Sequence, residues 1–337
     1  MSYERRKLDS VHFPSFLKSL PKSNGKVVVI TGTTSGTGYI AARTAAQLGA
    51  TVYVLNRPSE RSAKALEAIQ KEVEGSTITQ VDCDLQSFDS VKSAIAILKE
   101  KCSNGIDVLC NNAGVMALKD EATVDGYDVQ MQTNHISHFL LTAELYPLLK
   151  KAADSNGDAR IVNHSSIARL AVKKLEAKYL EKNGGNLGGN GASMFFNGAR
   201  WVRYGQTKLA NAAFTASLHQ KLTAASSKVK ALVAHPGLAA TDLQVTSVKD
   251  GGMGAAATNF MMGFGQSMED GAMGILACMF LPGAQSGEFY GPGKGMFAMK
   301  GEAKPFALEK KYDNDKTIDL IWEKSCEATG VKQDFIN

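Results

Sequence analysis

The sequence of 337 residues lacks any long hydrophobic run, which argues against a membrane-spanning protein. Its most apolar stretch, residues 271–284, is about 14 residues long, whereas a spanning helix needs about 20. Residues 1–26 also lack a continuous apolar core of signal-peptide length, and Glu4 and Asp9 interrupt the basic residues there. We therefore expect a soluble, cytoplasmic protein without a transmembrane segment.

The sequence also lacks a dense cluster of Lys and Arg with interleaved aromatic residues, so we expect no nucleic-acid partner. The net charge of +5 is a mild excess that would suit an anionic cofactor. Organelle targeting is left open, as is peripheral membrane contact through Phe13, Phe16 and Leu17.

Cysteine is scarce and unpaired. The five cysteines form no C-x-x-C pair and their number is odd, which indicates neither a disulfide framework nor a zinc site, and favours a reducing compartment. His135 and His138 stand at i and i+3, but no carboxylate or third ligand accompanies them, so we predict no metal site. The cysteines are Cys83, Cys102, Cys110, Cys278 and Cys326.

A glycine-rich run, residues 31–38, is the most informative segment that is present. It follows the apolar stretch 27–30, which reads as a buried strand, and precedes residues 39–48, whose alanines and spaced aliphatic residues suit a helix on a sheet. Strand, tight turn and helix together present unpaired backbone N–H groups to a phosphate. The spacing is G-x-x-x-G-x-G, and by itself it leaves an ordinary structural turn open.

The same alternation of short apolar strands and helices continues along the chain. It predicts a single-domain, Rossmann-type α/β fold, a doubly wound parallel sheet with helices on both faces, whose ligands gather at the carboxyl ends of the strands. We expect strands at 27–30, 51–55, 77–81, 106–110, 160–163 and 229–234, and helices at 39–48, 60–74, 89–101, 129–150 and 204–222.

Three segments do not follow this alternation of strands and helices. Residues 1–25 form an N-terminal extension to a catalytic domain over 26–337. An insertion over about 168–203 contains the Gly- and Asn-rich stretch 182–198, which predicts irregular structure. Eight of the twelve methionines lie in 251–299, within a segment of about 242–300 that could cap an apolar substrate pocket or belong to the core or a subunit contact.

Cofactor preference is predicted from the end of the second strand. A carboxylate about 20 residues beyond the glycines usually holds the ribose 2′-OH of NAD. Here Asn56 stands 20 positions after Gly36, and Arg57 follows it. A guanidinium can pair with a 2′-phosphate, so we expect NADP(H) rather than NAD(H).

Tyr204 and Lys208 form a candidate acid–base pair. Residues at i and i+4 of a helix project from one face, and a nearby cation lowers the pKa of a tyrosine. A phenol tuned in this way could give a proton to a carbonyl oxygen or take one from an alcohol. A Y-x-x-x-K pair alone is also common on helix surfaces.

Taken in order, these motifs resemble the short-chain dehydrogenase/reductase family over residues 26–241. Residues 321–330 resemble the ending of its retinol-dehydrogenase and WW-domain-oxidoreductase-like branch, although no WW module is present. The segments that carry the resemblance are TGTTSGTG, NR, DCDL, NNAG, TNHISHFLLT, IVNHSS, YGQTK and HPG.

The resemblance implies a role for each matching residue. Tyr204 would be the acid–base, Lys208 would lower its pKa and bind the nicotinamide ribose, Ser166 would bond the substrate oxygen, and Asn134 would anchor a proton-relay water. Ser165 is the neighbour most easily confused with Ser166. The residues implied in cofactor binding, besides Tyr204 and Lys208, are Gly32, Ser35, Gly36, Thr37, Gly38, Arg57, Asp84, Leu85, Asn112, Ala113, Gly114, Pro236, Gly237 and Thr241.

The resemblance further implies an NADP(H)-dependent oxidoreductase that interconverts an alcohol and a carbonyl. Apolar aromatic residues in the insertion suggest a lipophilic substrate, although packing of an exposed loop explains them equally well; they are Tyr179, Phe195, Phe196 and Trp201, with Met194 beside them. An NADP(H)-binding regulator or scaffold with little turnover is the alternative. A homodimer through the helices at 129–150 and 204–222 is left open, since the insertion could block it.

Overall fold

Parallel strands form the centre of the molecule. A computed structural model describes residues 3–192, 198–293 and 298–336, and over these ranges the strands form one eight-stranded sheet in the order β3-β2-β1-β4-β5-β6-β7-β8. Neighbouring strands are parallel except for β8, which runs antiparallel to β7 at one edge. The strands are β1 Val27–Thr31, β2 Thr51–Asn56, β3 Ile78–Asp82, β4 Val108–Asn111, β5 Ala159–His164, β6 Val229–Ala234, β7 Glu288–Gly291 and β8 Lys304–Ala307.

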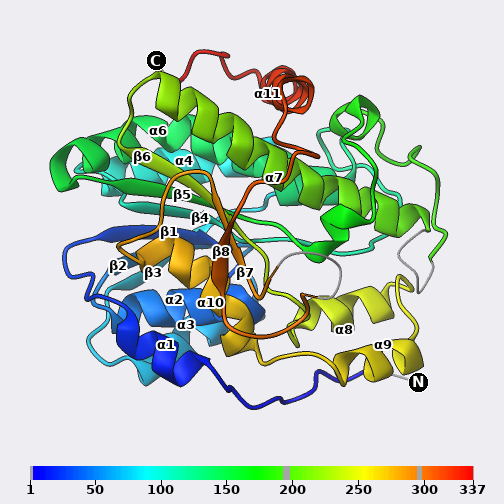
Figure 1. Ribbon diagram of the computed structural model, residues 1–337, viewed down its shortest axis with the longest axis horizontal. Coiled ribbons are helices and arrows are strands. Elements are labelled where there is room, and N and C mark those ends of the chain that lie inside the picture. The colour runs from blue at the N-terminus through cyan, green and yellow to red at the C-terminus, as the bar shows by residue number, and fades with distance from the viewer. Residues whose placement is uncertain (1–2, 193–197, 294–297, 337) are drawn as a thin grey trace.

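Helices cover both faces of the sheet, which confirms the predicted doubly wound α/β fold (Figure 1). Helices α2, α3 and α10 lie on one face, with α1 outside them against α10, and α4, α6 and α7 lie on the other, with α11 packed across α7. The helices are α1 Phe13–Ser19, α2 Gly36–Gln47, α3 Glu60–Glu72, α4 Phe88–Lys101, α5 Val129–Met131, α6 Ser137–Asn156, α7 Ala199–Ala224, α8 Asp242–Lys249, α9 Ala255–Met262, α10 Met268–Phe280 and α11 Asp315–Thr329.

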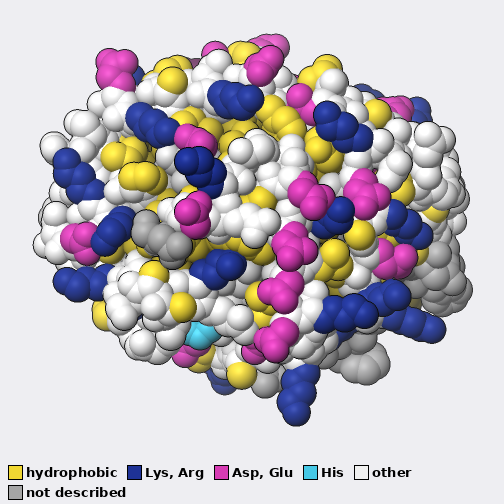
Figure 2. Space-filling view, turned by 90° about the horizontal axis from the view of Figure 1, so that it is seen from above, with side chains coloured by type: hydrophobic (Ala, Val, Ile, Leu, Met, Phe, Trp, Pro, Cys, Tyr) yellow, Lys and Arg dark blue, Asp and Glu magenta, His cyan; other side chains and the backbone are white. Residues whose placement is uncertain are grey.

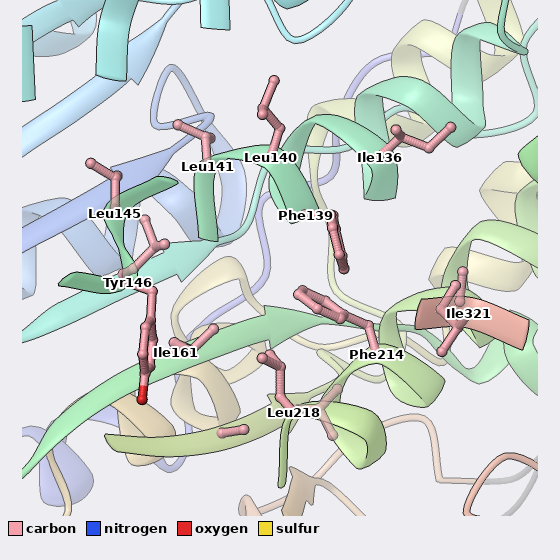
Figure 3. Close-up of a cluster of buried hydrophobic side chains, with 14 of the residues drawn as sticks. Ile136, Phe139, Leu140, Leu141, Leu145, Tyr146, Ile161, Phe214, Leu218 and Ile321 are labelled. Carbon is pink, nitrogen blue, oxygen red and sulfur yellow. The ribbon is translucent and has the colours of Figure 1, made fainter. Parts of the chain in front are cut away.

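Every residue of the central strands β4 and β5 is buried, as expected for a parallel sheet with both faces covered. On the α6 and α7 side, Phe139 and Phe214 meet with ring centroids 5.1 Å apart, and Ile321 of α11 lies beside them (Figure 3). Trp322 adds an edge contact to Phe139 at 5.5 Å. Helix α11 therefore closes the core over the two helices through which a dimer could form.

Several elements differ from the sequence-based expectation. The helix expected at 204–222 begins at Ala199, so that Tyr204 lies in its second turn. The helix expected at 129–150 is interrupted by a π-helical turn, Gln132–Ile136, before it continues as α6. The insertion contains two short 3₁₀ turns, Ile167–Leu170 and Ala177–Leu180.

The described part of the segment 242–300 divides between two of the roles left open for it, the core and a cap. Helix α10 packs on α2 and on four strands, and its side chains from Gly271 to Phe280 are buried. Strand β7 joins the main sheet beside β6. Both belong to the core because α10 is buried from Gly271 to Phe280 and β7 is buried at Phe289 and Tyr290. Helices α8 and α9, in the described part of this segment, lie outside the sheet layers as a cap.

No helix within the described part of the chain is long and apolar enough to cross a membrane. All five cysteines are buried free thiols. On the face above α6, α7 and α11, Lys and Arg side chains are interspersed with Asp and Glu side chains (Figure 2). The charges on this face therefore alternate in sign.

Candidate active site

The glycine turn after β1 is packed so closely that its glycines cannot carry side chains. A Cβ on Gly38 would lie 2.2 Å from the carbonyl oxygen of Gly32 and 2.3 Å from Nδ2 of Asn112. Gly32 and Gly36 also adopt positive φ angles of 71° and 61°, which glycine accepts without strain. Asn112 fixes the turn because its Nδ2 donates to the carbonyl oxygens of Thr31 and Gly32, at 2.9 and 3.0 Å.

A cleft of about 300 Å³ opens beside this turn at the carboxyl ends of the parallel strands. The structure brings all but one of the sequence-predicted cofactor residues to its walls, and Gly237 lies instead at an adjoining cavity. The predicted residues that line the cleft are Gly32, Ser35, Gly36, Thr37, Gly38, Arg57, Asp84, Leu85, Asn112, Ala113, Gly114, Tyr204, Lys208, Pro236 and Thr241.

The N-terminus of α2 faces this cleft. Ser35 is the N-cap residue, yet its side chain does not cap the helix, and the first turn carries no acidic residue. The unpaired N–H groups and the positive end of the helix dipole are thus available to an anion. This arrangement can hold the phosphate groups of a dinucleotide.

At the end of β2, Asn56 stands where a carboxylate would otherwise hold the ribose 2′-OH of NAD. Asn56 is buried, its Oδ1 accepts from the Thr33 N–H at 2.8 Å, and its Nδ2 donates to Thr33 Oγ1 at 2.9 Å. It supports the glycine turn, whereas Arg57 stands exposed at the cleft. A second guanidinium, Arg61, also reaches the cleft and was missed by sequence reasoning.

Tyr204, Ser166 and Lys208 meet at the inner end of the cleft. Burial raises the pKa of Tyr204 to about 12, and a hydrogen bond with Ser166 opposes that rise. Burial also lowers the pKa of Lys208 to about 8. The Lys208 Nζ lies 5.7 Å from the centroid of the Tyr204 ring and donates to the His164 carbonyl oxygen at 3.0 Å.

The expected lowering of the Tyr204 pKa is therefore wrong for the protein chain alone. The sequence shows the i, i+4 cation, but it does not show that both side chains are withdrawn from water. Burial penalises the charged form of each group, and this penalty exceeds the stabilisation of a phenolate at that separation.

The two neighbouring serines have different partners. Ser165 Oγ donates to the main-chain carbonyl of Lys208 at 2.7 Å, so it ties β5 to α7. Ser166 bonds the Tyr204 side chain and lines the adjoining cavity. Of the two serines, Ser166 is therefore the one placed beside the Tyr204 side chain.

Asn134 lies in the π-helical turn. Its Oδ1 accepts from the Val115 N–H at 2.7 Å, and its Nδ2 donates to the Val115 carbonyl and to Thr207 Oγ1, both at 2.9 Å. A Cβ on Gly114 would lie 3.2 Å from Asn134 Oδ1 and 3.3 Å from Lys208 Nζ. Asn134 thus connects the loop after β4 to α7, close to Lys208.

His164, which the sequence reading passed over, lines both the cleft and the adjoining cavity. Its Nδ1 lies 3.1 Å from Asn112 Oδ1, which also accepts from Thr37 Oγ1 at 3.0 Å. Because that atom is an acceptor, Nδ1 must carry the ring proton. Burial and the nearby Lys208 lower the His164 pKa to about 3, so the ring is neutral.

His135 and His138 do not converge on a common point. His138 contacts Thr31 Oγ1 at 2.8 Å and the Asn134 carbonyl at 3.0 Å, whereas His135 Nε2 lies 2.8 Å from Ser325 Oγ. Both histidines therefore serve packing. Among the described residues, no group of three or more His, Cys, Asp or Glu could hold a metal ion.

A second cavity, of about 100 Å³, adjoins the inner end of the cleft and has apolar walls. Tyr204 and Thr37 belong to both spaces. Of the aromatic residues in the insertion, Trp201 lines this cavity, Tyr179 packs in the core, and residues 194–196 lie outside the described residues. Its remaining apolar lining is Met116, Ile167, Ala168, Ala171, Pro236, Gly237, Leu238, Ala239, Leu243, Met253 and Met261.

The methionine-rich segment is divided between two roles. Met253 and Met261 line the second cavity, whereas Met273 and Met279 belong to α10 and are buried in the core. Met296 lies outside the described residues. Neither role could be assigned from composition alone, because methionine suits both.

Comparison with known proteins identifies the family to which this site belongs. Residues 26–180 match the model of the short chain dehydrogenase family. Retinol dehydrogenase 12 of Mus musculus is 30% identical over 311 residues, which cover 91% of this chain and 87% of that relative. An uncharacterised oxidoreductase of Schizosaccharomyces pombe is 35% identical over 228 residues, 66% of this chain and 63% of the relative, so the chain spans less than two thirds of that protein.

The fold comparison agrees. A crystal structure of an uncharacterised protein from Mycobacterium paratuberculosis is 29% identical, has a TM-score of 0.69, and is matched over 97% of this chain and 99% of its own. The chain belongs to the short-chain dehydrogenase/reductase family, in its retinol-dehydrogenase-like branch, whose oxidoreductases act on alcohols and carbonyls.

Proposed function

We propose that this protein is an NADP(H)-dependent oxidoreductase that interconverts an alcohol and a carbonyl on a lipophilic small molecule, with Tyr204 as the acid–base. The observation that carries the proposal is that a polar cleft and an apolar cavity meet at Tyr204. The glycine turn, in which a Cβ would clash, fits the close approach of a dinucleotide.

Hydride transfer is the chemistry that a nicotinamide cofactor supplies when bound. The chain itself supplies the proton and its placement. Tyr204 Oη gives a proton to the carbonyl oxygen in reduction and takes one from the alcohol in oxidation. Ser166 bonds Tyr204 and would orient the same oxygen. Lys208 stands beside the phenol with a pKa lowered by burial, within reach of proton exchange near neutral pH.

The end of β2 supports the choice of NADP(H). Arg57 is exposed at the cleft, and the neighbouring Asn56 places no carboxylate against a 2′-phosphate. Titration with NADPH and NADH, followed by nicotinamide fluorescence, tests this choice for the wild type and Arg57→Ala. We expect tight NADPH binding that weakens selectively in the variant. Equal affinity for both cofactors would contradict it.

A lipophilic substrate is supported by the walls of the second cavity, which are apolar apart from a few groups near Tyr204. Retinol dehydrogenase 12 of Mus musculus, a relative matched over 91% of this chain, is named for such an alcohol. A panel of aldehydes of increasing apolar size tests the proposal. Turnover should rise with size up to the limit of the cavity, and a preference for charged sugars would contradict it.

A regulator or scaffold with little turnover is the alternative. It has no need of Asn134, Ser166, Tyr204 and Lys208 together, since binding requires only the cleft. Comparison of the wild type with Tyr204→Phe on the same panel separates the two. An enzyme should lose about three or more orders of magnitude in turnover while NADPH binding stays within about twofold. A scaffold should show no difference between the two proteins.

A further inference from the structure

A buried arginine that the proposed mechanism does not use lies three residues after Ser166. Arg169 belongs to the 3₁₀ turn Ile167–Leu170 and is fully buried. Its neighbours Ile167 and Ala168 line the second cavity, whereas the described lining of the cleft and of the cavity does not include Arg169 itself. A guanidinium in the interior is costly unless charge and hydrogen bonds compensate for the lost water. Its partners therefore indicate what it holds in place.

The first partner of Arg169 is the main chain of Ser166. Arg169 Nη1 donates to the Ser166 carbonyl oxygen at 3.1 Å, and the main-chain N–H of Arg169 donates to the same oxygen at 3.1 Å. On the other side, Ser166 Oγ accepts from the Ala168 N–H at 3.2 Å. Because that bond uses only a lone pair of Oγ, the hydroxyl proton of Ser166 stays available for donation.

The second partner of Arg169 is a carboxylate from the segment that follows β8. Glu309 Oε1 accepts from Arg169 Nη2 at 2.5 Å, across 140 positions of sequence. From the same segment, Lys311 Nζ donates to the carbonyl oxygens of Arg169 and Leu170, at 3.1 and 3.3 Å. One negative and one positive side chain of this segment thus hold the turn that begins at Ser166.

The flat face of the guanidinium is also fixed. Arg169 Cζ lies 4.3 Å from the centroid of the Phe289 ring in β7, and Phe306 of β8 stacks on that ring with centroids 4.8 Å apart. A guanidinium that lies over an aromatic ring gains a cation–π attraction. Arg169 is therefore held both through its nitrogens and through its face, so that it can transmit the position of the sheet edge to Ser166.

We propose that Arg169 and Glu309 are a positioning pair for Ser166, which sets where the Ser166 hydroxyl stands relative to Tyr204. The inference rests on the proposed function, in which Ser166 orients the substrate oxygen. It adds to that function a contribution of the segment after β8 to proton transfer. A misplacement of about 1 Å, even by a change distant from the chemistry, can cost about 100-fold in rate, so the pair should act on kcat rather than on cofactor affinity.

The test replaces the pair by apolar side chains, Arg169→Met together with Glu309→Leu. Removing both charges at once avoids leaving one of them unpaired in the interior. We expect kcat for an aldehyde of the panel to fall about tenfold to fiftyfold, because Ser166 loses the side chain that holds its carbonyl. The Kd for NADPH should stay within about twofold. Urea unfolding of the same protein reports whether it folds.

Arg160 provides a matched control. It is a buried arginine at the start of β5, it pairs with Asp158, and it donates to two main-chain carbonyl oxygens. The Asp158 and Glu309 side chains are both 22% exposed. Arg160→Met with Asp158→Leu should unfold at a lower urea concentration, yet its kcat should stay within about twofold of the wild type, because this pair lies at the opposite end of β5 from Ser166.

A double-mutant cycle with Ser166→Ala identifies the route by which the pair acts. In the Ser166→Ala protein, Arg169→Met with Glu309→Leu should lower kcat by less than about a further twofold, because the hydroxyl that the pair positions is gone. If the apolar pair does not fold, Glu309→Gln enters the same cycle, since it keeps an acceptor oxygen on a partly exposed side chain. Its loss in kcat should be about threefold to fivefold, and this loss too should vanish in Ser166→Ala.

Three results would overturn the inference. They are a loss in kcat no larger than that of the Arg160 control, a loss that persists in full in Ser166→Ala, and a loss of NADPH affinity as large as the loss in kcat. Each of them leaves the proposed function intact. A folded wild type that binds NADPH but reduces no aldehyde of the panel would instead refute the proposed function itself.

Discussion

The polar cleft and the apolar cavity meet at Tyr204, yet they are built in different ways. The cleft is lined by short motifs at the ends of successive strands, and its side chains are held by hydrogen bonds such as those of Asn112. The cavity is lined by residues from distant segments, including Met116, Trp201 and Met261. Directional bonds demand particular residues at fixed positions, whereas apolar contact demands only shape. The cleft therefore suits one ligand of fixed chemistry, whereas the cavity suits apolar ligands that differ in shape.

The largest expected effect is a loss of stability in acid, because four imidazoles, among them that of His164 at the cleft, are buried in the uncharged form. Burial lowers the pKa of four histidines to about 3 or 4, well below an unfolded value of about 6.5. The unfolded chain then binds more protons than the folded one, so stability is lost as pH falls below about 6.5. The four are His135, His138, His164 and His235.

Lowering the pH from 7.5 to 5.5 should reduce the free energy of unfolding by about 1.4 kcal/mol for each of these histidines. The carboxyl of Asp128, whose pKa burial raises to about 6, offsets about 1 kcal/mol of the sum. Urea unfolding should thus show a free energy about 4 to 5 kcal/mol lower at pH 5.5. His138→Gln should reduce this pH dependence by about one proton. An unfolding free energy that is flat over this range would contradict the neutral, buried state of the rings.

The second prediction separates the two adjacent serines. Ser166→Ala removes the hydroxyl that bonds Tyr204 and should lower turnover about 100-fold, with NADPH affinity unchanged. Ser165→Ala removes a buried bond to the Lys208 carbonyl and should lower the free energy of unfolding by about 1 kcal/mol, with turnover within a few-fold. Steady-state kinetics and urea unfolding of both variants check this. Reversed phenotypes would exchange the two roles.

The third prediction challenges the rigid packing of the cleft. In Gly38→Ala the new methyl group would meet Gly32 and Asn112, and repacking should weaken NADPH by about 2 to 3 kcal/mol, or roughly 30-fold to 200-fold. Gly283→Ala is the control, because a Cβ there meets nothing within 4 Å. Fluorescence titration measures both variants. Retention of wild-type affinity in Gly38→Ala would show that the turn adapts freely.

The smallest effect is expected in the apolar cavity. Trp201 packs edge-on against Tyr204 with ring centroids 5.9 Å apart, and its Nε1 donates to the Gly252 carbonyl at 3.0 Å. Trp201→Phe keeps the apolar wall but loses this bond, and should raise KM for bulky aldehydes about threefold to fivefold while NADPH affinity stays within about twofold. If cofactor affinity fell as much as KM rose, the two regions would not be independent.

The sequence could predict the cleft because its determinants are local. Gly32, Gly36 and Gly38 follow an apolar strand at fixed spacing, and the parallel fold carries Asn112 and Tyr204 to the same edge. The sequence could not predict that Arg61 reaches the cleft. A cation in the first turn of a helix is usually an exposed surface residue, and nothing near it in the sequence indicates otherwise. Its side chain is held at the cleft by Asp242, which lies 181 positions away.

The same limit applies to the cavity and to the catalytic pKa. No spacing rule links Trp201 to Met253 and Met261, since α7 and the cap meet only after folding. The π-helical turn at Asn134 has no distinct composition either. The direction of the Tyr204 pKa shift differs from the expectation because burial is a property of the whole fold, whereas the cation at i+4 is visible in the five residues 204–208.

The attachment of the N-terminal segment bears on how the chain is synthesised. The backbone N–H groups of Val11, His12 and Phe13 all donate to the carboxylate of Asp270, at 2.8 to 2.9 Å. Their acceptor therefore leaves the ribosome more than 250 residues after them. At typical elongation rates of roughly 5 to 20 residues per second, this segment must wait at least about ten seconds before it can dock. During this time the apolar side chains of α1, such as Phe13, have no α10 to pack against.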